Sequence, residues 1–88
     1  ITVLMERRSS KMSENMVDVT LHIDETTSHE QRENLCDTLR ALDGVAAASS
    51  HDEKPHLLVV EYDPDRIKSS AFLNVAKESG LHAELIGL

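Results

Sequence analysis

The chain has 88 residues, of which nine are Lys or Arg and sixteen are Asp or Glu, so its net charge is −7. This length fits one domain, because chains divide into several domains only at much greater size. An acidic surface is repelled by phosphate backbones and by anionic lipid, which argues against nucleic-acid binding and against a role at a membrane. The single cysteine, Cys36, excludes an internal disulfide and fits a cytoplasmic location.

The beginning of the chain differs in composition from the remainder. Residues 1–16 hold three basic and two acidic side chains, which is +1, so residues 17–88 carry −8. Residues 7–15 are rich in Ser, Lys and Glu and have no apolar period. This composition predicts a flexible tail over 1–15 and a globular unit over 16–88. Met5, Met12 and Met16 are the candidate starts of the natural protein.

The globular unit opens with a strand and a helix. Apolar and polar residues alternate over 17–23, which predicts a strand with one buried face. Ser and Thr at 26–28 are N-cap candidates, and Glu30 and Gln31 lie where capping-box partners belong. A leucine stripe then predicts a helix over 28–42. Gly44 suits the left-handed position that ends such a helix.

The second half repeats the pattern after a hairpin. Residues 45–50 form a weak strand rich in Ala and Ser, and residues 51–55 connect it to a strongly apolar strand over 57–62. A second helix follows over 69–79 and ends at Gly80. The alternation over 81–85 predicts the last strand.

The order strand, helix, strand, strand, helix, strand predicts an α+β fold of the ferredoxin-like βαββαβ type. Right-handed crossovers then give a four-stranded antiparallel sheet in the order 4-1-3-2, with both helices on one face. Side-chain parity directs a largely polar set to the other face: Asp18, Thr20, His22, Val59, Glu61, His82 and Glu84.

Three short stretches resemble the heavy-metal-associated domains, which occur in copper chaperones and at the N-termini of metal-transporting P-type ATPases. They are Leu-x-x-Leu-Asp-Gly-Val at 39–45, Val-Glu-Tyr-Asp-Pro at 60–64 and Glu-Ser-Gly-Leu-His-Ala at 78–83. The resemblance covers residues 17–88 and implies the ferredoxin-like fold together with a relation to metal binding and metal transport. Each stretch marks the end of a helix or strand, so the resemblance speaks for fold more than for function.

The functional signature of that family is absent. The family carries Gly-Met-x-Cys-x-x-Cys between the first strand and the first helix, where residues 25–32 here read Glu-Thr-Thr-Ser-His-Glu-Gln-Arg. Soft thiolates select Cu(I), so the missing cysteines argue against Cu(I). Cys36 lies on the apolar side of the first helix and is expected in the core. The metal-binding motif is therefore degenerate.

Three histidines are the candidate metal ligands, namely His22, His29 and His82. Antiparallel pairing of the first and last strands would make His22 and His82 neighbours on the open face, with His29 at the same end of the domain. Imidazole together with carboxylate suits Zn²⁺, Ni²⁺ or Co²⁺, and three carboxylates are candidate oxygen donors: Asp24, Glu25 and Glu84. The alternative is that all three histidines are ordinary surface residues, because their spacing matches no recognised ligand pattern.

No Gly-rich phosphate loop, paired acid and base, or nucleophile with a base is found, so we expect a non-enzymatic protein. Two interpretations remain. The first is a small metal-binding domain whose divergent site uses His and carboxylate. The second is a metal-free interaction or regulatory module, whose partner docks on the acidic sheet face or on the edge strand over 45–50. That edge strand could also pair with its copy in a homodimer.

Overall fold

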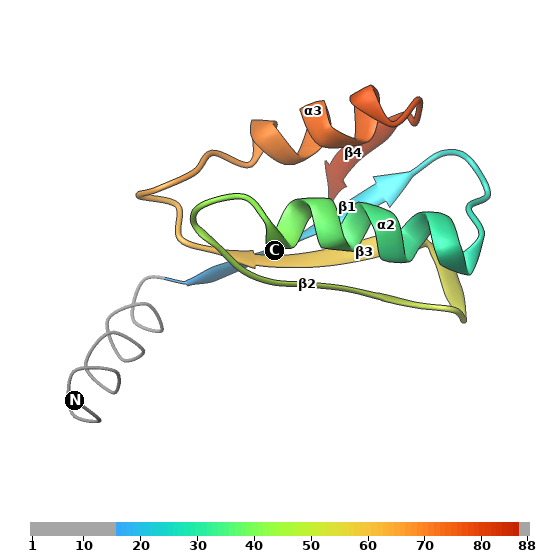
Figure 1. The fold of residues 1–88 in the computed structure, drawn as a ribbon, viewed down its shortest axis with the longest axis horizontal. Helices are drawn as coiled ribbons and strands as arrows, with labels where there is room; N and C mark the ends of the chain where they lie inside the picture. Colours follow the sequence, from blue (N-terminus) through green and yellow to red (C-terminus); the bar gives the residue numbers. More distant parts are fainter. Residues whose placement is uncertain (1–15, 87–88) are drawn as a thin grey trace.

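The computed structural model describes residues 16–86, and the predicted tail over 1–15, with candidate starts Met5 and Met12, lies outside the described residues. The element order is β1 (Val17–Ile23), α2 (His29–Arg40), β2 (Val45–His51), β3 (Lys54–Tyr62), α3 (Ser70–Glu78) and β4 (Ala83–Ile86). The strands form one antiparallel sheet in the order β2-β3-β1-β4. Figure 1 shows α2 and α3 on the same face of this sheet. The ferredoxin-like fold and its strand order are therefore confirmed.

Helix α2 begins at the predicted capping box and ends at Arg40, two residues before the predicted end at residue 42. Ser28 is the N-cap: its hydroxyl accepts a hydrogen bond from the Gln31 amide, and the Gln31 side chain accepts one from the Ser28 amide. This reciprocal capping box satisfies donors that a helix otherwise leaves free. Beyond the helix, Gly44 has a φ of 101°, which favours glycine over any residue with a Cβ.

The core lies between the sheet and the two helices. Cys36 is fully buried there, as expected, and burial raises the pKa of its thiol. Tyr62 packs edge to face on Phe72, with 4.9 Å between the ring centroids. The other buried apolar residues are Val19, Leu21, Ile23, Leu35, Leu39, Ala48, Leu58, Val60, Val75 and Ala76. None of the helices within residues 16–86 is long and apolar enough to cross a membrane.

Two strands begin at a different residue than the sequence predicts, each for a local reason. Strand β3 begins at Lys54 rather than at residue 57, because His51 pairs with Lys54 directly across a tight turn. Strand β4 begins at Ala83 rather than at residue 81. The Leu81 amide donates instead to the Ala76 carbonyl at the end of α3, and the His82 amide donates to the Glu25 carboxylate.

Strand β2 forms one edge of the sheet, and its middle is covered by Arg40 from α2. The guanidinium Nε and Nη2 both donate to the Ala48 carbonyl, at 3.0 and 2.7 Å. A carbonyl oxygen has two lone pairs, so these two bonds saturate it. The Ala48 carbonyl is thereby closed to any further strand that approaches the edge.

Candidate metal centre

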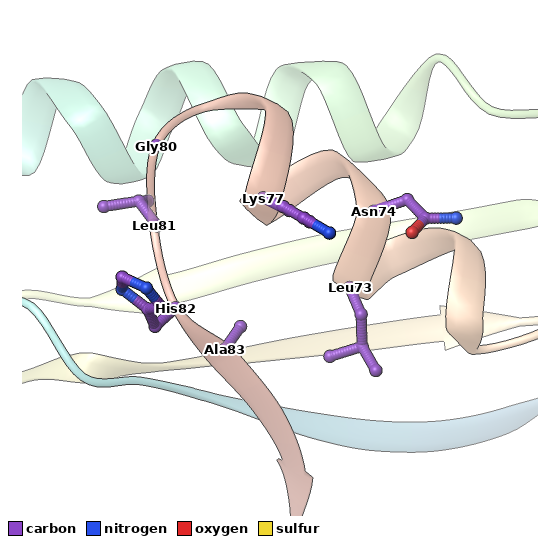
Figure 2. A pocket seen from close by; sticks show the side chains of 7 residues that line it. All are labelled: Leu73, Asn74, Lys77, Gly80, Leu81, His82 and Ala83. Carbon is purple, nitrogen blue, oxygen red and sulfur yellow. The ribbon is translucent and has the colours of Figure 1, made fainter.

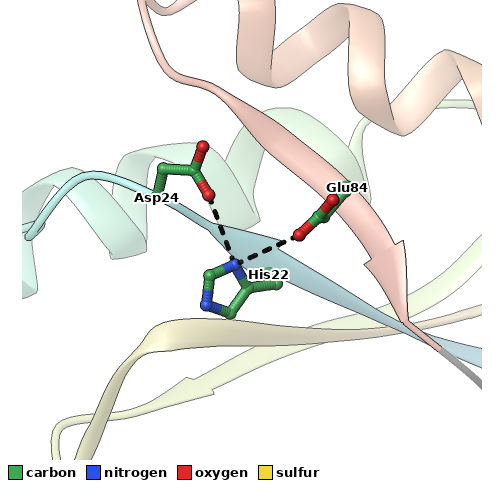
Figure 3. A group of neighbouring side chains, drawn as sticks. All are labelled: His22, Asp24 and Glu84. Atoms are coloured by element: carbon green, nitrogen blue, oxygen red, sulfur yellow. Dashed lines mark ion pairs between the residues drawn. The ribbon is translucent and has the colours of Figure 1, made fainter.

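One imidazole and two carboxylates meet where β1 and β4 lie side by side. The β1–β4 register sets Glu84 directly opposite His22, and Asp24 follows β1 immediately. Figure 3 shows both carboxylates directed at Nδ1 of His22. One ligand atom from each of the three residues lies within 4.8 Å of the others. His22 and Glu84 belong to paired strands, and the Asp24 amide donates to the His82 carbonyl just beyond them, so backbone hydrogen bonds fix their relative positions.

The distances within this cluster suit shared coordination better than hydrogen bonding. Nδ1 of His22 lies 3.5 Å from Asp24 Oδ1 and 4.0 Å from Glu84 Oε1. Hydrogen bonds to nitrogen are shorter, at about 2.7–3.2 Å. Two ligand atoms on one tetrahedral Zn²⁺ are about 3.4 Å apart, given bonds of about 2.1 Å. Within residues 16–86, Nδ1 of His22 is also buried and makes no hydrogen bond, so no donor among these residues competes with a cation for it.

A second histidine supports the ring of His22. The two rings of His22 and His56 stack with centroids 5.8 Å apart and planes at 17°. Nδ1 of His56 lies 2.8 Å from the Ile23 carbonyl oxygen, which can only accept, so this nitrogen carries the proton. His56 is thus held in one tautomer and one orientation, and its ring forms a fixed wall beside His22.

His82 pairs with Glu25 and does not join this cluster. The His82 amide donates to Glu25 Oε1 at 2.8 Å, and its Nδ1 lies 2.5 Å from Oε2. These hydrogen bonds lower the pKa of Glu25 from its ordinary 4.5 to about 2, and the carboxylate raises the pKa of His82 above 6.5. His82 also lines a cavity of about 360 Å³ between α3 and β4, together with Leu73 and Lys77 (Figure 2).

His29 is engaged by the β2–β3 turn. Its Nδ1 lies 2.8 Å from Asp52 Oδ1, and Nη2 of Arg32 donates to the same oxygen at 2.7 Å. Asp52 raises the pKa of His29, which in turn lowers the pKa of Asp52. Arg32 is 3% exposed and also donates to the Thr27 carbonyl at 2.6 Å. This network ties the loop before α2 to the hairpin.

The three predicted histidine ligands therefore lie apart, each beside different carboxylates: Asp24 and Glu84 for His22, Asp52 for His29 and Glu25 for His82. His22 alone belongs to the cluster with Asp24 and Glu84, two of the oxygen donors expected from the sequence. Register is the reason, because it sets Glu84 rather than His82 opposite His22. The sequence interpretation missed His56 beside His22, for which strand parity gave no signal, since His56 shares the inward parity of Leu58.

Comparison with solved structures gives the same fold. The copper binding domain from HMA7, a P-type ATPase, matches with a TM-score of 0.71 and 18% identity, over 80% of this chain and 93% of that one. Oxidized MerP from Ralstonia metallidurans CH34 matches with a TM-score of 0.73 and 15% identity, over 82% and 99%. The CopZ metallochaperone matches with a TM-score of 0.70 and 18% identity, over 77% and 100%.

Sequence comparisons identify no related protein or family. No protein-family model matches the chain, and no curated protein matches it either. At identities of 15–18%, the structural likeness establishes the fold. The chain accordingly has the fold of the heavy-metal-associated domains, as the sequence resemblance predicts.

Proposed function

We propose that this protein is a small, non-enzymatic metal-binding domain that holds a divalent transition ion through His22, Asp24 and Glu84. The observation that carries the proposal is Nδ1 of His22, which makes no hydrogen bond within residues 16–86 and faces carboxylate oxygens at 3.5 and 4.0 Å. The same fold in proteins named for copper binding and metal transfer supports a metal-related role.

The donor set favours a borderline ion. One imidazole nitrogen and two carboxylate oxygens suit Zn²⁺, Ni²⁺ or Co²⁺, whereas Cu(I) prefers thiolate. If Glu25 is aligned with the glycine of the family motif, Ser28 and Gln31 fall at the two cysteine positions. Both side chains are occupied by the capping box. The only thiol, Cys36, is buried in the core and so cannot replace the pair.

Three protein ligands leave at least one position of a tetrahedral ion open. The Asp24 and Glu84 side chains are 63% and 70% exposed, so the bound ion would remain accessible to an incoming ligand. An exposed and incomplete coordination shell suits reversible carriage of an ion better than permanent structural binding. It also fits the kinship in fold with a metallochaperone.

The test is a competition titration of the protein with Zn²⁺, Ni²⁺, Co²⁺ and Cu(I). Binding is monitored by NMR of the histidine rings. We expect at least one divalent ion to bind with a Kd below about 10 μM and to shift the His22 ring resonances most. His22→Ala should lower the affinity at least about tenfold, whereas His82→Ala should leave it within about twofold. Binding that survives His22→Ala, or tight binding of Cu(I) alone, would overturn the assignment.

A metal-free interaction module remains the second candidate, because none of the helices within residues 16–86 covers one face of the sheet (Figure 1). Docking through the edge strand β2 would conflict with the hydrogen bonds that Arg40 makes there. A homodimer through β2 would need this guanidinium to release the Ala48 carbonyl, which it binds twice. The sheet face itself presents no such obstacle.

A further inference from the structure

The sheet face opposite the helices carries three rows of side chains that run across the strands. Cross-strand register defines them, since directly paired residues point to the same side. The central row is Ser49, Val59, Thr20 and Ile86; one flanking row is Ala47, Glu61 and Asp18; the other is Leu57, His22 and Glu84. The central row therefore sets Val59 and Ile86 between two rows that each contain carboxylate.

The centre of this face carries two exposed apolar side chains. Val59 is 37% exposed and Ile86 is 41% exposed, and they lie on either side of Thr20. None of the side chains in the three rows is Lys or Arg. Exposed apolar side chains rimmed by polar ones are typical of binding surfaces, and carboxylates around them favour a partner of opposite charge.

The spacing of the rows matches one turn of a helix. Successive rows are two residues apart along a strand, which is about 6.6 Å. Residues i and i+4 of a helix share a face and differ by about 6.0 Å along the axis. A helix aligned with the strands, as α2 is on the other face (Figure 1), would meet the rows at i, i+4 and i+8.

The geometry points to this face as a docking surface for a basic amphipathic helix of a partner protein. The helix carries Lys or Arg at i and i+8, which pair with the Glu61 and Glu84 rows, and a large apolar residue at i+4, which covers Val59. Residues 17–88 carry a net charge of −8, which further favours a basic partner. The inference does not rest on the metal site, although an ion at His22 would neutralise one acidic row.

The probe is a synthetic alanine-rich peptide of about 16 residues, long enough to form a helix, with Lys, Leu and Lys at four-residue spacing. A scrambled peptide of the same composition is its control. Titration is followed by amide and methyl NMR of the protein in the presence of a chelator, which removes competition from metal. We expect shift changes centred on Thr20, Val59 and Ile86, and at least about fivefold weaker binding of the scrambled peptide.

Two charge-reversal variants distinguish binding at this face from nonspecific electrostatic attraction between the basic peptide and the acidic protein. Glu61→Lys lies on the face, whereas Glu78→Lys makes the same charge change at the exposed end of α3. We expect Glu61→Lys to weaken binding about three- to tenfold and Glu78→Lys to change it by less than about twofold. Equal effects of the two variants, equal binding of the two peptides, or shift changes centred on α2 and α3 would overturn the proposal. Amide spectra of both variants verify that they fold.

Discussion

His22 lies directly opposite Glu84 across the β1–β4 ladder, with its buried Nδ1 4.0 Å from Oε1 of the carboxylate. The pair joins a central strand to an edge strand, so its geometry depends on register rather than on loop conformation. A one-residue slip of β4 would direct Glu84 to the opposite face of the sheet. The ladder that forms the fold therefore also forms the candidate metal centre.

Two matched Glu-to-Gln substitutions on the same sheet face test the proposed metal centre. Glu84→Gln removes one oxygen ligand and should lower the affinity for Zn²⁺ about tenfold or more, because a neutral amide binds a divalent ion poorly. Glu61→Gln makes the same chemical change two rows away and should leave the affinity within about twofold. Isothermal titration of both variants measures the difference. Equal losses would show that general negative charge, rather than coordination, attracts the ion.

His56 should influence the centre through the ring of His22. His56→Ala removes the stacked ring and the hydrogen bond to the Ile23 carbonyl, so the imidazole of His22 gains freedom that binding must then remove. We expect a loss of about tenfold in metal affinity, as for other groups that orient a ligand. His56→Phe keeps a ring of similar shape and should recover part of this loss. The same titration checks both variants, and unchanged affinity in His56→Ala would contradict the prediction.

The Glu25–His82 pair should stabilise the protein most in weakly acidic solution. Glu25 has a lowered pKa, so its contribution is present above about pH 4.5 and is lost as the pH falls towards 2. His82 has a raised pKa, so its contribution is present below pH 6.5 and is lost as the pH rises through that raised value. Both contributions are complete only between pH 4.5 and 6.5.

NMR titration of the His82 ring measures this coupling. In Glu25→Gln the pKa of His82 should fall back towards its ordinary value of 6.5, because both the hydrogen bond and the charge of the carboxylate are lost. His29 serves as the internal control, since its raised pKa depends on Asp52. A His82 pKa that does not respond to Glu25→Gln would show that the pair does not form in solution.

The buried guanidinium of Arg32 should make the stability of the protein depend on its ion-pair partner, Asp52. Asp52→Ala leaves a buried cation without its counter-ion, whereas Arg32→Met removes the charge and keeps most of the volume. We expect Asp52→Ala to lower the urea midpoint more than Arg32→Met, which should cost within about 1 kcal/mol. Unfolding at pH 7 measures both. The reverse order would mean that the hydrogen bonds from Arg32 to Thr27 outweigh the ion pair.

Arg40 should protect the β2 edge from self-association. Arg40→Ala frees the Ala48 carbonyl for a strand from another molecule, so light scattering should show more association at high protein concentration. Arg66→Ala removes the same charge from an exposed side chain that lies 3.5 Å from Asp43. It should associate no more than the parent protein. If both variants associate alike, the cause is net charge and not the edge.

Gly44 and Gly80, the glycines with positive φ within residues 16–86, provide a matched pair for stability. A Cβ on Gly44 would lie 2.9 Å from Cγ2 of Ile67 and 3.0 Å from Cβ of Arg66, whereas a Cβ on Gly80 meets nothing within 4 Å. Gly80→Ala should therefore cost about 1 kcal/mol for backbone strain alone, and Gly44→Ala about 2–4 kcal/mol. Thermal unfolding compares them. Similar losses would show that the segment around Ile67 yields to the added methyl group.

Local sequence determined the elements of this protein. The alternation over 17–23, the capping pair Ser28 and Gln31, and the two helix-ending glycines each act within a few residues, so they are visible before the chain folds. Together with the order of strands and helices, they also determined the sheet order, because crossover handedness leaves few arrangements.

Tertiary structure decided the site. The pairing of β1 with β4 joins residues about sixty positions apart, and its register sets Glu84, not His82, beside His22. Likewise, the β2–β3 turn brings Asp52 to His29 and Arg32, and the end of β1 brings the Ile23 carbonyl to His56. Parity assigns a side chain to a face, but only register assigns it a partner. The sequence therefore predicted a histidine and carboxylate centre at this end of the sheet, and the folded ladder brings His22, Asp24 and Glu84 together as its candidate ligands.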